Sequence, residues 1–288
     1  MKFPQSLPRL LTASSLAAVV VVNVALAQQV KGASTPAAKA PASEYQPTVG
    51  QEGKDVVWVP TPQALVDKML DMAQVTPNDY VIDLGSGDGR TVITAAKRGV
   101  KAHGIEYNPD MVALSKKNAE QAGVTDKATF VRGDIFESDF SKATVITLFL
   151  LPSLNQRLRP LILDMKPGTR VVSNTFDMGD WPADQTVQAT GDCSSYCRAY
   201  FWMVPAKVEG KWKLPAGELA LEQKYQSVSG SLTADNVNAP VNGKLIGDQI
   251  TFTAGRTVYI GRVGDNTIEG TARSGDSETK WQATRAPK

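Results

Sequence analysis

Apolar positions between residues 55 and 182 repeat in two alternating patterns, one typical of buried strands and one typical of amphipathic helices. Apolar, β-branched runs that suit strands buried on both faces lie at residues 80–84, 100–107, 128–131, 143–151 and 169–173. Helical spacing recurs over residues 62–73, 91–98, 109–122 and 154–165. The first of these helices is expected to have Thr61 as its N-cap residue. Strands and helices that alternate with short connections predict a parallel sheet with helices on its faces.

The pattern changes towards the C-terminus. Residues 186–189 and 198–205 are expected to finish the sheet as two antiparallel strands. From about residue 207 the helical period disappears, and short alternating runs separated by Gly, Asp and Asn predict an antiparallel β meander, a small sandwich or open barrel. The predicted fold class is therefore α/β, a Rossmann-like sheet with flanking helices over residues 55–205, followed by a small antiparallel all-β domain over residues 206–288.

The first 27 residues have the pattern of an export signal. Lys2 and Arg9 precede an apolar stretch that ends in a small-x-small cleavage site. We expect cleavage after Ala27 and a periplasmic or secreted protein. The alternative is an uncleaved N-terminal membrane anchor, because the apolar stretch is nearly long enough to span a bilayer. Residues 28–54 are rich in Ala, Pro, Ser, Gly and Gln, which predicts a flexible tether.

The charge balance argues against a nucleic-acid substrate. The chain has 31 Lys and Arg against 29 Asp and Glu, and loss of Lys2 and Arg9 with the export signal leaves 29 against 29. Enzymes that act on nucleic acids usually carry a basic surplus for phosphate contacts, so we expect no nucleic-acid partner. The one histidine, His103, lies inside a predicted strand and is expected to be structural, and no metal site is predicted.

Cys193 and Cys197 are too few for a zinc site of their own, and in an exported chain they are candidates for a disulfide. The bridge would close a short loop between the two antiparallel strands. Closing so small a loop stabilises by only roughly 2 kcal/mol on the chain-entropy estimate. Such a bond would fix a hairpin tip and is not required for folding.

The candidate chemistry centres on a stretch reading YVIDLGSGDGR, in which a buried strand is followed by Gly85, Gly87 and Gly89 and then by a helix. Glycines let this turn bend sharply and let a ligand lie against bare backbone, and the amides of the next helix face the same side. Dinucleotide-binding enzymes need G-x-G-x-x-G, and this chain has Arg90 in place of the third glycine of that pattern. The G-x-G-x-G spacing, with Asp83 two residues before it, instead resembles the first motif of class I S-adenosylmethionine (SAM) methyltransferases.

Acidic residues at the ends of the next two strands extend this pattern. Ligands bind across the carboxyl ends of parallel strands, where the glycine turn and both acids are expected to meet. Glu106 is placed to accept both ribose hydroxyls and Asp134 to accept from the adenine amino group. Ile135 or Phe136 is placed to pack on the ring. Asp83 is placed to hold the turn or to meet the amino group of the methionine part, and Ser86, within the turn, is assigned to the same cofactor site.

The segment from about residue 55 to residue 182 resembles one branch of the class I methyltransferases. The residues that carry the resemblance are VPTP at 59–62, DLGSGDGR at 83–90 and GIEYNP at 104–109. That branch contains the lysine methyltransferases of the mitochondrial ATP-synthase c subunit and of adenine nucleotide translocase, with their bacterial relatives. The resemblance implies SAM as cofactor and methyl transfer to an amine acceptor, a protein lysine being favoured.

Asn155 and Asp180 are the candidates for orienting the acceptor amine. Positioning supplies about 7–11 kcal/mol. Deprotonating a lysine at pH 7 costs roughly 4.6 kcal/mol, so no strong general base is required. The segment Leu151-Pro152 replaces the Asp/Asn-Pro-Pro-aromatic signature of enzymes that methylate base amines, which disfavours that chemistry.

Two other functions stay open at this point. An exported, non-catalytic binding or scaffold protein that retains the fold is consistent with the export signal, because SAM is made in the cytosol. A nicotinamide-dependent oxidoreductase shares the fold, although Arg90 argues against it. The expected partner is a protein or small-molecule methyl acceptor, with membrane contact only through the N-terminal segment if that segment is uncleaved.

Overall fold

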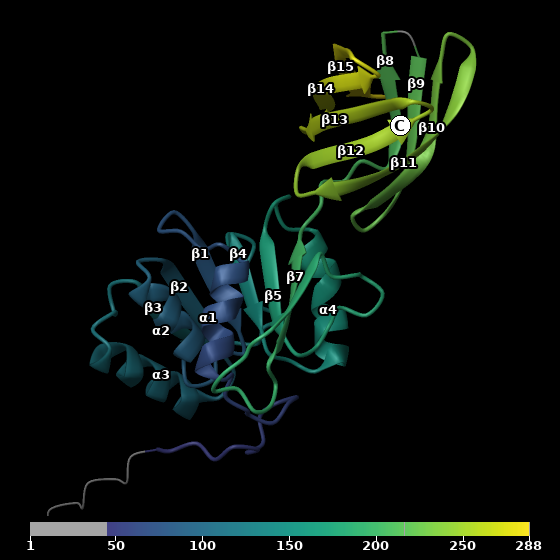
Figure 1. The fold of residues 1–288 in the computed structure, drawn as a ribbon. Helices are drawn as coiled ribbons and strands as arrows, with labels where there is room; N and C mark the ends of the chain where they lie inside the picture. The colour runs from purple at the N-terminus through teal and green to yellow at the C-terminus, as the bar shows by residue number, and fades with distance from the viewer. Residues whose placement is uncertain (1–44, 216, 288) are drawn as a thin grey trace, which may run out of the picture. The chain divides into compact units, whose positions relative to one another are not determined.

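The computed structural model describes residues 45–215 and 217–287. The export signal expected at residues 1–27 and the part of the expected tether from 28 to 44 lie outside the described residues. Within the described part, an α/β domain is followed by an all-β domain, as predicted (Figure 1). No helix in these two ranges is long and apolar enough to cross a membrane.

The α/β domain contains a seven-stranded sheet in the order β3-β2-β1-β4-β5-β7-β6. Its strands are β1 (Tyr80–Leu84), β2 (Lys101–Glu106), β3 (Ala128–Arg132), β4 (Val145–Leu148), β5 (Arg170–Asn174), β6 (Gln185–Gln188) and β7 (Arg198–Met203). β1 to β5 are parallel, and β7 runs antiparallel between β5 and β6. The predicted parallel sheet, finished by two antiparallel strands, is therefore confirmed. β4 is shorter than the expected 143–151, because its pairing with β5 ends at Leu148.

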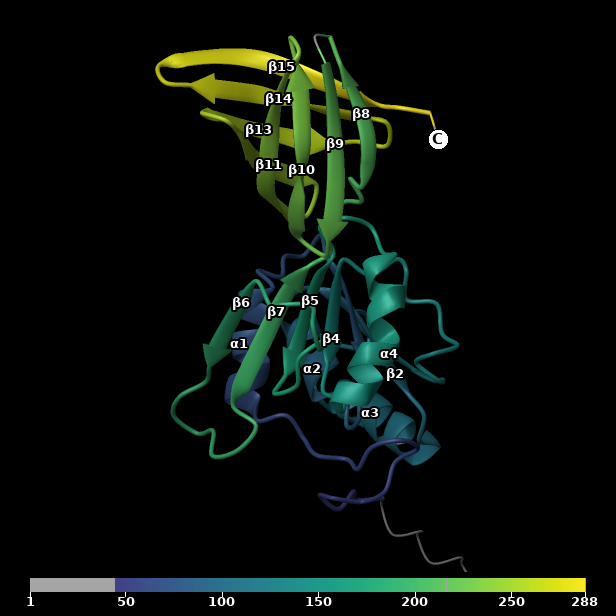
Figure 2. The same ribbon diagram turned by 90° about the vertical axis from the view of Figure 1, so that its right-hand side faces the viewer.

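Four helices cover the two faces of this sheet (Figure 1 and Figure 2). They are α1 (Gln63–Met72), α2 (Arg90–Lys97), α3 (Pro109–Gln121) and α4 (Pro152–Leu163). Apolar side chains of α1, α2 and α3 share one buried core with the sheet, and those of α4 share a second. The domain therefore has the three layers of a doubly wound fold, whose carboxyl strand ends are the usual place for a ligand.

Helix starts depart from the sequence prediction in two places. Thr61 does not cap α1: Pro62 occupies the N-cap position without a side-chain cap, and Thr61 Oγ1 instead accepts a hydrogen bond from Asn174 Nδ2 at 3.2 Å. α4 begins at Pro152, earlier than expected, because the fixed φ of proline suits the first turn of a helix. α3 begins as predicted, with the Asn108 side chain accepting from amides of its first turn.

A buried polar cluster ties the beginnings of three strands to α1. Arg170 donates hydrogen bonds to the Asp79 carboxylate and, at 2.7 Å, to the carbonyl oxygen of Ala73 just after α1. Thr144 Oγ1 and the Thr76 amide donate to the same carboxylate at 2.7 and 2.8 Å. The cluster lies at the sheet edge opposite the carboxyl ends, and its charges are paired, so its role is structural.

The all-β domain is a closed antiparallel barrel. Its strands are β8 (Gly210–Leu214), β9 (Gly217–Lys224), β10 (Ser227–Ala234), β11 (Val237–Ile246), β12 (Gln249–Ala254), β13 (Thr257–Val263), β14 (Thr267–Ser274) and β15 (Ser277–Arg285). Each strand pairs with the next, and β15 closes on β8 through Thr284 and Arg285. The antiparallel meander is confirmed, whereas a sandwich or open barrel is wrong, because the pairing of first and last strands removes the open edges.

The barrel is filled by its own side chains. Trp212 and Phe252 are almost fully buried, and the Phe252 ring stacks on Tyr259 with ring centres 4.7 Å apart. The turn between β9 and β10 contacts the α/β domain: Gln226 Oε1 accepts from Trp181 Nε1 at 3.0 Å. This buried glutamine joins the two domains through hydrogen bonds.

Candidate active site

The glycine turn lies between β1 and α2 and has the geometry that its sequence predicts. Gly85, Gly87 and Gly89 have φ values of 83°, 53° and 83°, in the left-handed region that side-chain-bearing residues rarely adopt. The amide of Gly85 donates to the Ile105 carbonyl at 2.9 Å, which holds the turn against β2. A Cβ at Gly89 would lie 2.8 Å from the Phe130 ring, so this position has no room for a side chain.

A pocket opens at the carboxyl ends of the parallel strands, and we call it the strand-end pocket. It is lined mainly by residues 51–61, 85–88, 106–108, 133–135 and 148–150. Seven of the eight residues that the sequence assigns to a cofactor line it: Asp83, Gly85, Ser86, Gly87, Glu106, Asp134 and Ile135. Gly89 does not line the pocket, because it lies behind the turn as the N-cap residue of α2.

Glu106 connects β2 to the glycine turn. One carboxylate oxygen accepts from the Gly87 amide at 2.9 Å, and the other accepts from the Asn108 amide at 2.9 Å. Each carboxylate oxygen has a second lone pair, so both retain the capacity to accept from hydroxyl groups in the pocket.

Asp134 follows β3 and is paired with Lys54. Its carboxylate accepts from the Phe136 amide at 2.9 Å and forms an ion pair with the Lys54 ammonium group. The hydrogen bond from Lys54 and that from the Phe136 amide hold the pKa of Asp134 below its usual value. Asp134 is therefore an ionised acceptor at neutral pH.

Asp83 is the one deeply buried acid of the pocket. Burial raises its pKa to about 7, and the nearby Glu106 and Asp88 carboxylates add to the rise, against a 2.6 Å hydrogen bond from Thr147 Oγ1. The carboxyl group therefore titrates near neutral pH, and a cationic amino group beside it would keep it ionised. A second buried group, Ser86 Oγ, has no hydrogen-bond partner within the described ranges.

The segment before α1 forms the other side of the pocket, which the sequence analysis did not predict. Residues 45–54, predicted as the end of a flexible tether, are held by contacts such as the hydrogen bond from the Gly50 amide to the Trp58 carbonyl at 2.8 Å. Lys54 reaches Asp134 and lies 5.0 Å from the centre of the Tyr107 ring. The apolar run VVWVP downstream of the tether was the signal that this segment packs on the domain.

Arg90 and Trp58 join the glycine turn to that segment. The Arg90 guanidinium group pairs with the Asp88 carboxylate and donates to the Thr61 carbonyl at 2.9 Å. A Cβ at Gly87 would lie 2.7 Å from Trp58 Nε1, so the indole covers the backbone there. An arginine that anchors the pocket wall has no equivalent role in the G-x-G-x-x-G turn, which disfavours the nicotinamide alternative.

Asn155 is fully buried on α4 and does not line the strand-end pocket. Its Nδ2 donates to the carbonyl oxygens of Phe176 and Asp177 at 3.2 and 3.0 Å. Its Oδ1 has no hydrogen-bond partner in the described part of the chain. The expectation that Asn155 orients an acceptor amine is not supported by this geometry; the residue instead holds the loop that follows β5.

Asp180 also lies away from the pocket. Its side chain is 57% exposed, pairs with Arg159 and Lys224, and accepts from the Tyr225 hydroxyl at 2.8 Å. The Tyr225 hydrogen bond and the Arg159 charge lower its pKa. The predicted substrate-orienting role is not supported by this geometry, because Asp180 contacts the β9–β10 turn through Tyr225.

His103 is structural, as expected: its Nδ1 and Thr129 Oγ1 lie 2.8 Å apart in a contact between β2 and β3. Among residues 45–215 and 217–287, no cluster of His, Cys, Asp and Glu side chains is arranged to hold a metal ion. The pocket therefore offers backbone amides, carboxylates and apolar walls as its binding groups.

These features suit a nucleoside bearing an amino acid. The bare Gly85 backbone and the acids near the ends of β1, β2 and β3 fit SAM. Fold and pocket together define a SAM-dependent methyltransferase.

The comparisons with known proteins identify the family. The ANTKMT methyltransferase domain matches residues 83–185. A protein-lysine N-methyltransferase of Saccharolobus islandicus is 46% identical over 136 residues, which cover 46% of this chain and 84% of the relative. The Rattus norvegicus lysine N-methyltransferase of the ATP-synthase c subunit is 33% identical over 155 residues, 54% of this chain and 69% of the relative. The chain therefore belongs to this methyltransferase family.

Solved structures are similar to this chain as well. An RNA methyltransferase from Salinibacter ruber, in complex with S-adenosylhomocysteine, is 50% identical, with a TM-score of 0.49; the match covers 52% of this chain and 96% of that one.

Proposed function

We propose that this protein transfers a methyl group from SAM to a lysine side chain of a protein. The observation that carries the proposal is the strand-end pocket, in which Asp83, Glu106 and Asp134 face one space beside the glycine turn. Lysine as acceptor is supported by the names of two relatives, the Saccharolobus islandicus protein-lysine N-methyltransferase and the rat enzyme named for a lysine of the ATP-synthase c subunit.

The residues of the pocket have distinct tasks in this proposal. Glu106 binds the ribose hydroxyls, Asp134 the adenine amino group, Ile135 the ring face, and Asp83 the amino group of the methionine part. Asp134 keeps its ion pair with Lys54 in the structure, and each of its carboxylate oxygens has a second lone pair that can accept from the amino group. When bound, SAM supplies a methyl group already activated on a sulfonium. The protein then has to hold the acceptor amine in line, and positioning of about 7–11 kcal/mol exceeds the roughly 4.6 kcal/mol for deprotonation.

The first test is calorimetric titration with S-adenosylhomocysteine. We expect wild-type protein to bind and Glu106→Ala to bind about 100-fold more weakly, because two hydrogen bonds to a charged group are lost. Glu106→Gln should lie between them. The matched control is Glu269→Ala on β14, whose carboxylate contacts only Gln282 among the hydrogen bonds described. No binding by the wild type, or equal binding by Glu106→Ala, rejects the cofactor assignment.

The second test separates an enzyme from an exported binding protein that retains the fold. Protein with tritium-labelled SAM is incubated with extract, and labelled proteins are digested and analysed for methyl-lysine. Labelled lysine supports the proposal. Cofactor binding without transfer to any protein supports the non-catalytic alternative.

We also propose that the protein is exported and that its signal is removed after Ala27. The support is the basic start and apolar stretch of the N-terminal sequence, together with the disulfide between Cys193 and Cys197. The test is mass spectrometry of the protein from producing cells, with thiol labelling before reduction. An intact Met1 with two free thiols contradicts export.

A further inference from the structure

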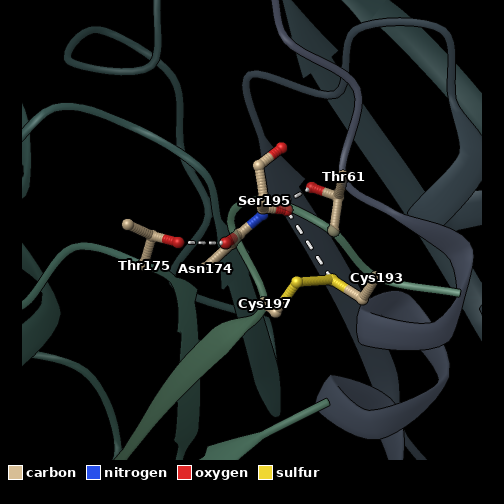
Figure 3. Close-up of a disulfide and its surroundings, with 6 residues drawn as sticks. All are labelled: Thr61, Asn174, Thr175, Cys193, Ser195 and Cys197. Atoms are coloured by element: carbon tan, nitrogen blue, oxygen red, sulfur yellow. Dashed lines mark hydrogen bonds between the residues drawn. A yellow bond between two sulfur atoms is a disulfide. The ribbon is translucent and has the colours of Figure 1, made fainter. Parts of the chain in front are cut away.

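A disulfide-closed loop lies at the same edge of the sheet as the strand-end pocket. Cys193 and Cys197 are bonded in the hairpin between β6 and β7, and β7 begins at the next residue, Arg198. β7 pairs with β5, whose last residue, Asn174, donates to Thr61 Oγ1 at the pocket wall. Figure 3 shows the disulfide with Thr61, Asn174 and Thr175 close by. The loop is therefore attached to the wall of the pocket.

The loop places Tyr196 against the pocket wall. The Tyr196 ring meets Phe149 edge-on, with ring centres 5.3 Å apart. Phe149 directly follows β4 and lines the strand-end pocket. Phe149 also stacks on Phe176, with ring centres 6.2 Å apart. Phe149, Phe176 and Tyr196 come from three segments and are joined through Phe149, which lines the strand-end pocket; we call these three rings the aromatic wall.

One residue of the aromatic wall and one residue beside it have a left-handed backbone conformation, which residues other than glycine rarely adopt. Tyr196 has φ of 55°, and Thr175, beside Phe176, has φ of 61°; both are left-handed non-glycine residues. The Thr175 amide donates to the Arg198 carbonyl at 2.7 Å, so the turn carrying Phe176 is joined to the residue after Cys197. Strained backbone of this kind persists where the surroundings over-determine it, often at ligand sites.

The outer part of Tyr196 is free to meet a ligand. Tyr196 is 41% exposed, whereas the adjacent Cys197 is buried in the core of the domain. An exposed tyrosine next to a disulfide that is buried at Cys197 and half-buried at Cys193 presents a ring with little conformational freedom to lose on binding. Aromatic faces pack well on methylene chains and attract alkylammonium groups, including methylated ones.

We propose that Tyr196 is a specificity-determining residue that contacts the acceptor side chain at the pocket mouth, and that the Cys193–Cys197 disulfide positions it there. The acceptor class is an amine on an alkyl chain, and a partly methylated amine is preferred to an unmethylated one. The proposal rests on the proposed methyl transfer to lysine and adds the recognition element and its dependence on the disulfide.

The test measures binding without turnover. Saturation-transfer NMR follows Nα-acetyl-lysine N-methylamide and its mono-, di- and trimethylated forms, with the protein saturated by S-adenosylhomocysteine. We expect wild-type affinity to rise with methyl number. Tyr196→Ala and the double variant Cys193→Ser/Cys197→Ser should each bind the dimethylated probe at least about tenfold more weakly. Tyr196→Phe should stay within twofold, because the ring is kept. Ser194→Ala, exposed in the same loop, is the matched control.

Two readouts separate this proposal from a structural role and from failure of the proposed function. S-adenosylhomocysteine affinity should be the same in all variants, which shows that the pocket is folded. With a lysine peptide, Tyr196→Ala should raise KM for the peptide at unchanged kcat. Equal probe binding by wild type and Tyr196→Ala, or no probe binding by cofactor-saturated wild type, overturns the proposal. Absence of S-adenosylhomocysteine binding by the wild type overturns the methyltransferase assignment itself.

Discussion

The two domains of this chain bury polar groups very differently. Eleven of the twelve buried polar residues in the described ranges belong to the α/β domain. The twelfth, Gln226, belongs to the barrel and makes its side-chain hydrogen bonds to Trp181, Pro182 and Asp184 of the α/β domain. The barrel interior is thus apolar, whereas the α/β domain carries buried groups that pair with one another or face its pocket. The domain that contains the strand-end pocket is therefore also the domain that contains most of the buried polar side chains.

The two domains also differ in where non-glycine residues adopt the left-handed backbone conformation. In the barrel, Asp235 and Asn236 have φ of 50° and 63° at a two-residue hairpin turn, a conformation that such turns require. In the α/β domain, Thr175 adopts the same region directly after β5, and Tyr196 adopts it in the disulfide-closed loop between β6 and β7. The same backbone conformation therefore serves folding in one domain and accompanies the aromatic wall in the other.

The largest expected effect tests whether the barrel is needed for the pocket. Phe252→Ala removes a ring that is 1% exposed, and should lower the free energy of unfolding by about 3–5 kcal/mol. S-adenosylhomocysteine affinity should stay within twofold at 20 °C, since Phe252 touches no pocket residue. Urea denaturation and calorimetry measure the two quantities. Thr253→Ala, on the exposed side of the same strand, is the control. A parallel loss of affinity in Phe252→Ala alone would show that the domains are coupled.

Asp83→Asn should separate stability from binding. The folded-state pKa is raised from 3.8 to about 7, so the folded protein holds a proton that the unfolded chain releases between about pH 4 and 7. Wild-type stability should therefore fall by about 4 kcal/mol as pH rises through that range and then stay level. The variant has no carboxylate to bury in its ionised form, so it should be more stable than the wild type at pH 8. It should bind S-adenosylhomocysteine more weakly, because it lacks the negative charge beside the amino group.

The measurement is urea denaturation of both proteins at intervals from pH 4 to 8. The difference between them removes the contribution of other titrating groups. Identical pH slopes in the two proteins would mean that Asp83 is ionised in the folded state throughout.

The parallel sheet and the cofactor edge were predictable because local signals agree there. Apolar runs, helix ends and the spacing from Gly85 to Glu106 all fix the same strand-turn-helix geometry. The closure of the barrel was not predictable, because it depends on pairing between β15 and β8, which are far apart in the chain. A strand meander has the same local pattern whether its edges meet or stay open.

Site residues outside the glycine turn were harder to predict for a similar reason. Lys54 reaches Asp134 across 80 positions of sequence. It ends a stretch, residues 28–54, whose composition is that of a flexible tether. Asn155 and Asp180 stand at the expected places after strands, yet their partners are Phe176 in one case and Tyr225 in the other. Sequence position identifies the sheet edge, whereas the direction of a side chain depends on contacts that only the folded chain makes.

Gln226→Ala tests the hydrogen bonds between the domains. The substitution leaves the buried Trp181 Nε1 and the Pro182 carbonyl without their partners, which should cost about 1–3 kcal/mol of the free energy of unfolding. Gln226→Glu keeps an acceptor for Trp181 and should lose less. Urea denaturation followed by tryptophan fluorescence measures both. A loss below the error of the method in Gln226→Ala would mean that these hydrogen bonds are exchanged for water without cost.

Asp180→Asn has the smallest expected effect and decides between two roles for the loop after β5. If Asp180 oriented an acceptor amine, its loss would lower the rate of methyl transfer at least tenfold. The structure pairs it instead with Arg159, Lys224 and Tyr225 at an exposed site, where ion pairs are screened by solvent. We therefore expect the methyl-transfer rate to a lysine peptide and the S-adenosylhomocysteine affinity to stay within twofold, with an unchanged urea midpoint. A selective fall in rate with unchanged cofactor affinity would return Asp180 to the acceptor site. It would also mean that the contact between the domains is part of the enzyme.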